Sequence, residues 1–80
     1  MKKSEIKKEL TEILLDRKFI KEGEPVNDTD SYDTDYGMDS LDKIELAMEI
    51  EKTYSISIPD DHLEKLNTVG ETVDYLHQIL

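Results

Sequence analysis

The sequence predicts an all-α fold: a four-helix bundle with three main helices, one short helix, and a long loop between the first and second helices. Apolar residues recur every three or four positions in separate segments, and capping residues stand where those segments begin. The one alternating stretch, residues 54–58, is short and has no partner strand, so we interpret it as an extended connector. Eighty residues without cysteine fit one domain, residues 1–80, stabilised by packing alone.

The first helix is expected over residues 4–16, with Ser4 available as its cap. The apolar residues that share one face of this segment are Ile6, Leu10, Ile13 and Leu14. Because acidic and basic residues are mixed on the opposite side, we interpret the segment as a packing helix rather than a membrane-surface helix.

The long loop is expected from about residue 21 to residue 39, where turn-forming residues follow one another with no periodicity. Long loops in small domains are uncommon unless they are functional or contain structure of their own. Val26, Tyr32 and Tyr36 are spaced so that they can hold this loop against the bundle.

The second helix should begin after Asp39, whose side chain can cap free amides, with Asp42 favouring the positive end of the helix dipole. It should run to about Tyr54. A proline then disfavours helical structure before it, and Asp60 is a competent cap for a third helix that extends barely two turns, to about Leu66.

The fourth helix should begin with a capping box formed by Thr68 and Glu71. Gly70 lies in its first turn and lowers the helix propensity there by roughly 1 kcal/mol relative to alanine. The apolar residues on one face of this segment are Val69, Val73, Leu76 and Leu80.

The charge is concentrated in the middle of the chain. Of the formal net charge of −10, residues 24–64 carry −11 and the remainder carries +1. Such a field repels nucleic acid and anionic membranes and attracts basic protein surfaces, although a merely solubilising acidic surface explains it equally well. Charges interrupt any apolar run after the basic start of the chain, and no segment is long enough to span a membrane, so we expect a cytoplasmic protein.

The outer face of the second helix combines apolar and acidic side chains. At 100° per residue, Leu41 and Met48 fall opposite the core-facing side and lie two turns apart along one line. The residues around them on that face are Asp42, Glu45 and Glu49, with Ile44 and Glu51 at its edge. This pattern is typical of a docking surface for a basic partner, but coverage by another helix is an equally good explanation at this point.

Ser40 stands in the first turn of the same helix, directly after the loop. A phosphate attached to its hydroxyl would lie near free backbone amides and the positive end of the dipole. Self-activated nucleophilic catalysis is not expected, because no G-x-S-x-G motif surrounds Ser40 and the adjacent carboxylates oppose alkoxide formation. His62 and His77, the only candidate bases, have no assignable orienting carboxylate, and we interpret both as helix-surface residues.

The segment Asp35-Tyr36-Gly37-Met38-Asp39-Ser40-Leu41-Asp42-Lys43-Ile44-Glu45-Leu46, with its core D-x-G-x-D-S-L-D, resembles the acyl carrier proteins of bacterial fatty acid synthesis. The likeness continues through residues 58–61, 68–69 and 74–76. It implies an acyl carrier domain over residues 1–80 with a four-helix fold, non-catalytic and monomeric. It also implies that a phosphopantetheinyl transferase attaches 4'-phosphopantetheine from coenzyme A to Ser40, and that fatty acid synthase enzymes with basic patches then use the arm.

The resemblance further implies roles for individual residues. Asp39 and Asp42 would help to present Ser40 to the transferase. The residues of the partner-recognition surface would be Leu41, Ile44, Glu45, Met48, Glu49 and Glu51. An acyl chain could shelter between the helices, where its lining would be Leu46, Ile50, Ile58, Leu63 and Leu66. Departures from the family pattern are Tyr32 in place of phenylalanine, Tyr36 in place of leucine, and the basic residues Lys43 and Lys52.

Three other interpretations remain open at this stage. A carrier for a polyketide, aminoacyl or D-alanyl cargo would use the same scaffold, although Gly37 and Asp39 favour the fatty-acid type. A calcium site in the acidic loop is disfavoured, since an EF-hand register that uses Gly37 places Tyr32 and Lys43 at ligand positions. An unmodified acidic adaptor domain would explain the docking surface but would leave Ser40 without a role.

Overall fold

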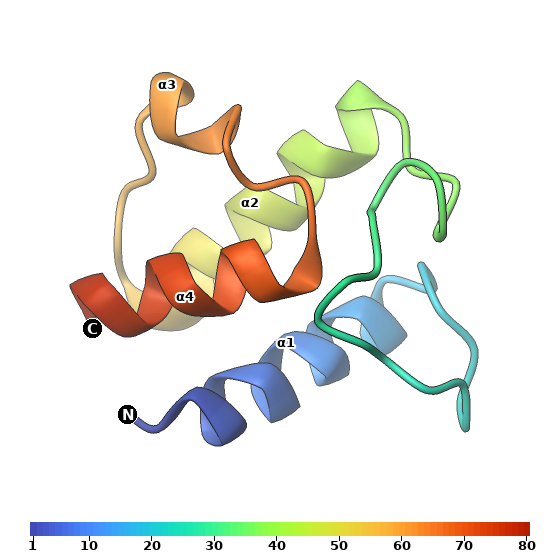
Figure 1. The fold of residues 1–80 in the computed structure, drawn as a ribbon. Coiled ribbons are helices and arrows are strands. Elements are labelled where there is room, and N and C mark those ends of the chain that lie inside the picture. The colour runs from blue at the N-terminus through green and yellow to red at the C-terminus, as the bar shows by residue number, and fades with distance from the viewer.

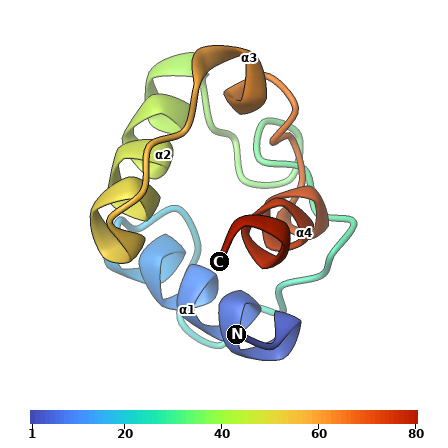
Figure 2. The same ribbon diagram turned by 90° about the vertical axis from the view of Figure 1, so that its left-hand side faces the viewer.

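The computed structural model describes residues 1–80 and confirms an all-α bundle with three main helices and one short helix (Figure 1). The helices are α1 (Lys3–Asp16), α2 (Ser40–Tyr54), α3 (Asp60–Leu63) and α4 (Val69–Ile79). The end view in Figure 2 shows α1, α2 and α4 arranged around a common core, with α3 lying between the ends of α2 and α4. The only β-type pairing is an isolated bridge between Ser31 and Thr68.

α1 begins one residue earlier than expected, and Ser4 is not its cap. The backbone N–H of Lys2 donates to the carboxylate of Glu5 at 3.1 Å, so the helix is capped from within its own first turn and Ser4 lies inside it. The predicted apolar face is confirmed, because Ile6, Leu10, Ile13 and Leu14 are all buried. This face packs against both α4 and α2.

The long loop is fastened to the segment before α4. The backbone N–H of Tyr32 donates to the carbonyl of Asn67, and that of Val69 donates to the carbonyl of Asp30, both at 3.0 Å. Tyr32 is buried in the core, as predicted, while Val26 and Tyr36 are partly buried against it. Sequence reasoning missed two further loop residues that the core buries, Ile20 and Met38.

α3 is shorter than predicted. It forms a single turn, with Pro59 at the cap position and Asp60 as its first helical residue, because the fixed φ of proline places the extended residue at 59. After Leu63 the chain continues in turns, and the N–H of Leu66 donates to the carbonyl of Leu63 at 3.1 Å. None of the four helical residues is buried, so α3 lies on the core rather than in it.

The predicted capping box of α4 is only half formed. Thr68 Oγ1 accepts a hydrogen bond from the N–H of Glu71 at 3.1 Å, but the carboxylate of Glu71 accepts from the N–H of Asn67 instead of Thr68. The N–H of Gly70, in the first turn of α4, donates to the carbonyl of Asp28 at 2.8 Å. The start of α4 is therefore held by the loop as well as by its own cap.

Candidate functional site

The start of α2 is built by two reciprocal hydrogen bonds. The carboxylate of Asp39 accepts from the N–H of Asp42 at 2.8 Å, and the carboxylate of Asp42 accepts from the N–H of Asp39 at 3.1 Å. Just before them, Gly37 has a φ of +65°, which only glycine adopts without strain, and Met38 is buried in the core. The end of the loop is thus fixed on both sides of the turn that leads into Ser40.

Ser40 is the first helical residue of α2, and its side chain is exposed to solvent. The capping box engages the amides of Asp39 and Asp42, so the amides of Ser40 and Leu41 are left for other acceptors. A phosphodiester on the hydroxyl of Ser40 would lie beside these two amides at the positive end of the helix dipole. The residues present therefore fit a prosthetic group attached through phosphate.

The outer face of α2 is exposed, so no other helix of the chain covers it. Leu41 and Met48 are 62% and 61% exposed, and Ile44 between them is 46% exposed. The opposite face enters the core as predicted, through Leu46, Ala47 and Ile50. The two predicted faces of this helix are therefore confirmed, with large apolar side chains exposed among carboxylates on the outer one.

Two carboxylates of the predicted partner surface already have partners in the fold. The carboxylate of Glu45 contacts the guanidinium of Arg17 at 3.3 Å, and both side chains are partly exposed. The carboxylate of Glu51 accepts a hydrogen bond from the N–H of Ile58 at 2.7 Å. Glu51 therefore supports the connector to α3, a function that sequence reasoning missed, while Glu49 makes no such bond.

An open groove of about 690 Å³ begins at Ser40 and runs along α2. α2 forms one wall through Ile44, Ala47 and Met48, and the other wall comes from the α3 region. Of the residues predicted to line an acyl site, Ile58 and Leu63 lie here. The groove thus connects the serine to the apolar side chains between α2 and α3.

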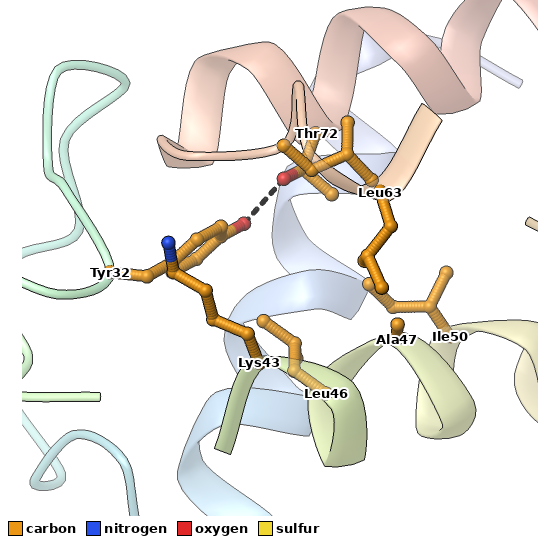
Figure 3. Close-up of a pocket in the computed structure, with 8 residues that line it drawn as sticks. Tyr32, Lys43, Leu46, Ala47, Ile50, Leu63 and Thr72 are labelled. Carbon is orange, nitrogen blue, oxygen red and sulfur yellow. Dashed lines mark hydrogen bonds between the residues drawn. The ribbon is translucent and has the colours of Figure 1, made fainter. Parts of the chain in front are cut away.

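A second and much smaller cavity, of about 10 Å³, lies inside the bundle (Figure 3). Four predicted acyl-site residues line it, namely Leu46, Ile50, Leu63 and Leu66. Sequence reasoning missed the rest of the lining, which is Tyr32, Lys43, Ala47 and Thr72. The two hollows share Lys43, Ala47 and Leu63, so these side chains separate the groove from the interior.

The polar end of this cavity is a hydrogen bond between Tyr32 and Thr72. The two hydroxyl oxygens lie 2.6 Å apart and both residues are buried. Burial raises the pKa of the Tyr32 phenol well above its ordinary value. The replacement of phenylalanine by tyrosine at 32 was the only sequence signal for this pair, and its partner lies forty residues away.

Three acidic side chains of the long loop, those of Asp30, Asp33 and Asp35, accept hydrogen bonds from other residues of the loop. Asp30 accepts from the N–H of Asn27 at 2.9 Å, and Asp35 accepts from the N–H of Ser31 at 2.7 Å. The hydroxyl of Ser31 and the N–H of Thr34 donate to Asp33. The backbone bond holds the pKa of Asp30 below its ordinary range, and the Ser31 bond does the same for Asp33.

The histidines are not near a carboxylate that could orient them. His62, interpreted from the sequence as a helix-surface residue, is half-buried on α3, with Nδ1 3.0 Å from the hydroxyl of Tyr75 and the two rings edge to face. His77 is exposed, and its Nδ1 lies 3.1 Å from the carbonyl oxygen of Met1. Packing against the ring of Tyr75 on α4 accounts for the position of His62 on α3.

Comparisons with known proteins agree with a site for a prosthetic group attached through phosphate. Residues 8–76 match the family model described as a phosphopantetheine attachment site. An acyl carrier protein of Porphyromonas gingivalis is 36% identical over 77 residues, which cover 96% of this chain and 97% of that protein. An acyl carrier protein of Rubrobacter xylanophilus is 42% identical over 76 residues, covering 95% and 93%.

The match to a phosphopantetheine attachment site, together with the exposed serine at a helix start, identifies a carrier domain. The chain belongs to the acyl carrier protein family. Its prosthetic group is covalently attached 4'-phosphopantetheine. None of its helices has the length and apolar character needed to cross a membrane.

Proposed function

We propose that this chain carries the acyl intermediates of fatty acid biosynthesis in the cytoplasm, as thioesters on an arm attached to Ser40. The observation that carries the proposal is the exposed hydroxyl of Ser40 on a capped helix start, beside two free amides and at the head of a groove. When bound, the 4'-phosphopantetheine group supplies a terminal thiol that holds acyl groups.

Ser40 acts as the acceptor in the attachment reaction. Its Oγ forms a bond to the phosphorus next to the pantetheine of coenzyme A, the pyrophosphate bond breaks, and adenosine 3',5'-bisphosphate leaves. The proton of the hydroxyl passes to a base of the phosphopantetheinyl transferase, because the carboxylates of Asp39 and Asp42 are turned toward backbone amides. These two aspartates hold the helix start in position and present acidic charge to the transferase.

The exposed face of α2 selects the enzymes that use the arm. Leu41, Ile44 and Met48 supply apolar contact area, and Glu45 and Glu49 attract basic patches on fatty acid synthase enzymes. The net charge of −11 over residues 24–64 steers those enzymes to this side of the bundle. Glu51 contributes charge at the edge of this face while its carboxylate supports the α3 connector.

The apolar side chains between α2 and α3 shelter the cargo. Ile58 lies in the groove that begins at Ser40, on the side of Glu51, and Leu46, Ile50, Leu63 and Leu66 lie around the interior cavity. A cavity of about 10 Å³ has room for about one water molecule, so a chain enters only when side chains of the α3 region move. α3 is suited to such movement because its single turn buries no residue.

Intact mass spectrometry tests the attachment. After incubation with coenzyme A and a phosphopantetheinyl transferase, the chain should gain the mass of one arm, and Ser40→Ala should gain none. Ser57→Ala, which alters another exposed serine, is the matched control and should be modified like the native chain. Modification of Ser40→Ala, or none in the native chain, would overturn the assignment.

A reconstituted set of bacterial fatty acid synthesis enzymes tests the pathway. The protein with its arm should accept a malonyl unit and support repeated chain extension, measured by the mass of the protein-bound acyl group. Loading by an amino-acid-activating enzyme, with no malonyl loading, would instead assign the chain to an aminoacyl pathway.

A further inference from the structure

The cavity inside the bundle has one polar end, and its hydrogen atoms can be assigned. Thr72 Oγ1 lies 3.0 Å from the carbonyl oxygen of Thr68 and donates to it, as expected for a threonine hydroxyl one turn along a helix. A threonine hydroxyl has a single hydrogen. In the contact of 2.6 Å between Tyr32 and Thr72, the phenol must therefore be the donor and Thr72 Oγ1 the acceptor.

This assignment leaves the oxygen of Tyr32 as an acceptor with no donor in the chain. The phenol has donated its only hydrogen, yet its oxygen keeps acceptor capacity at the wall of the cavity (Figure 3). The rest of that wall is mainly apolar: Leu46, Ala47, Ile50, Leu63 and Leu66, with the stem of Lys43. The amine of Lys43 is directed to the side chain of Asn67 at 3.3 Å.

We propose that the Tyr32–Thr72 pair makes this cavity selective for acyl chains that carry a hydroxyl group. This inference rests on the proposed carrier function and names the class of cargo that the interior favours. The hydroxyl of such a chain donates a hydrogen bond to the oxygen of Tyr32. A keto group can only accept a hydrogen bond, and the Tyr32 phenol has already donated its hydrogen to Thr72. A saturated chain gains apolar contacts but no hydrogen bond.

Two adjoining hollows lie between Ser40 and the Tyr32–Thr72 pair. The groove that begins at Ser40 and the interior cavity share the side chains of Lys43, Ala47 and Leu63. Displacement of Leu63, which is only half-buried, joins the two hollows without unfolding α2 or α4. The α3 region is held from the other side by the contact between His62 and Tyr75.

The experiment compares loaded forms of the protein. The native chain is given its arm and loaded with an octanoyl chain, with octanoyl chains bearing a hydroxyl near the thioester, in the middle or at the far end, and with the matching keto chains. Intact mass confirms each load, and both the rate of thioester hydrolysis and the midpoint of thermal unfolding are then measured.

At least one hydroxylated chain should be hydrolysed about fivefold more slowly than the saturated chain, as one added hydrogen bond predicts, and its protein should unfold at a higher temperature. Tyr32→Phe should remove this difference. Thr72→Val frees the phenol hydrogen of Tyr32, so protection should pass from the hydroxylated chain to the keto chain. Tyr36→Phe, which removes a phenol bonded to Asp30 outside the cavity, should behave like the native chain.

Equal hydrolysis of all loaded chains on the native protein would overturn this inference alone. Failure of Ser40 to accept the arm would overturn the carrier proposal and this inference together, and the mass spectra distinguish the two results. If Tyr32→Phe does not fold, Thr72→Val still decides, because an unchanged preference for the hydroxylated chain in that variant contradicts the assigned hydrogen-bond direction.

Discussion

The carboxylate of Glu51 accepts a hydrogen bond from the backbone N–H of Ile58 at 2.7 Å, which ties α2 to the chain that enters α3. The carbonyl of Glu51 also accepts from the N–H of Ile56 at 3.0 Å, where Ser55 ends the helix in a left-handed conformation. One residue on the edge of the exposed face thus fixes the whole connector on which the groove depends.

Replacement of Glu51 should therefore destabilise the fold. Glu51→Ala leaves the N–H of Ile58 without an acceptor, and we expect the free energy of unfolding to fall by about 2 kcal/mol. Urea denaturation followed by circular dichroism measures it. Glu49→Ala, on the same helix and without a side-chain hydrogen bond, should change stability by less than about 0.5 kcal/mol. Equal effects of the two changes would contradict a structural role for Glu51.

Glu45→Lys should separate partner recognition from folding. The Glu45–Arg17 ion pair is exposed, so its loss should cost less than about 1 kcal/mol and leave the helical circular dichroism intact. Turnover by partner enzymes should fall, because the reversed charge lies between Leu41 and Met48 and repels a basic patch. Steady-state rates with the loaded protein measure this effect.

Asp74→Lys is the matched control for that variant. It makes the same charge change on α4, also breaks an exposed ion pair, with Lys3, and should leave turnover near the native value. An equal loss of turnover in both variants would show that net charge, rather than the α2 face, controls recognition. Collapse of the helical signal in Glu45→Lys would show that the face was wrongly assigned.

The helices were predictable because their signals are local. Asp39 and Asp42 lie three residues apart and cap α2 as predicted, and Thr68 caps α4. The end of α2 at Tyr54 was also predicted correctly. The prediction was less accurate where two local signals compete. At the start of α1, Ser4 was expected to cap the helix, but Glu5 makes the capping hydrogen bond instead.

The long-range contacts of the loop could not be predicted from one sequence. The Tyr32–Thr72 hydrogen bond joins residues that no periodicity relates, and it forms only after the loop has folded across α4. The same holds for the contact of Asp28 with Gly70. Local patterns therefore located Ser40 and the exposed face, whereas the polar end of the cavity required the assembled structure.

The contact between Gly70 and Asp28 predicts an unusual response to alanine. In an isolated helix, Gly70→Ala would stabilise by about 1 kcal/mol. Here the new Cβ would lie 2.9 Å from the backbone oxygen of Asp28, and a main-chain atom moves less easily than a side chain. We expect Gly70→Ala to lower the free energy of unfolding by about 1–3 kcal/mol.

Urea denaturation again measures this change, and Gln78→Ala, at an exposed position of the same helix, is its control. Stabilisation by Gly70→Ala would mean that the loop shifts away from α4 at little cost. In that event the backbone hydrogen bond from Gly70 to Asp28 would not be a strong constraint on the loop.

Three tyrosines should make the fold sensitive to alkaline pH. Burial raises the pKa of Tyr32, Tyr36 and Tyr54 above their ordinary value of 10.0, and the last two phenols also donate to the carboxylates of Asp30 and Glu9. Because the folded state holds these protons more tightly than the unfolded state, their stabilising contribution is complete below pH 10 and is lost as pH rises toward their folded-state pKa values.

In a titration above pH 10, the ultraviolet absorbance of these phenolates should therefore appear together with the loss of helical circular dichroism rather than before it. Tyr54→Phe removes one of the three groups. Once its stability at neutral pH is allowed for, this variant should unfold at a higher pH than the native chain. Phenolate absorbance from all the tyrosines while the helices remain intact would contradict the burial of Tyr32 on which the polar end of the cavity depends.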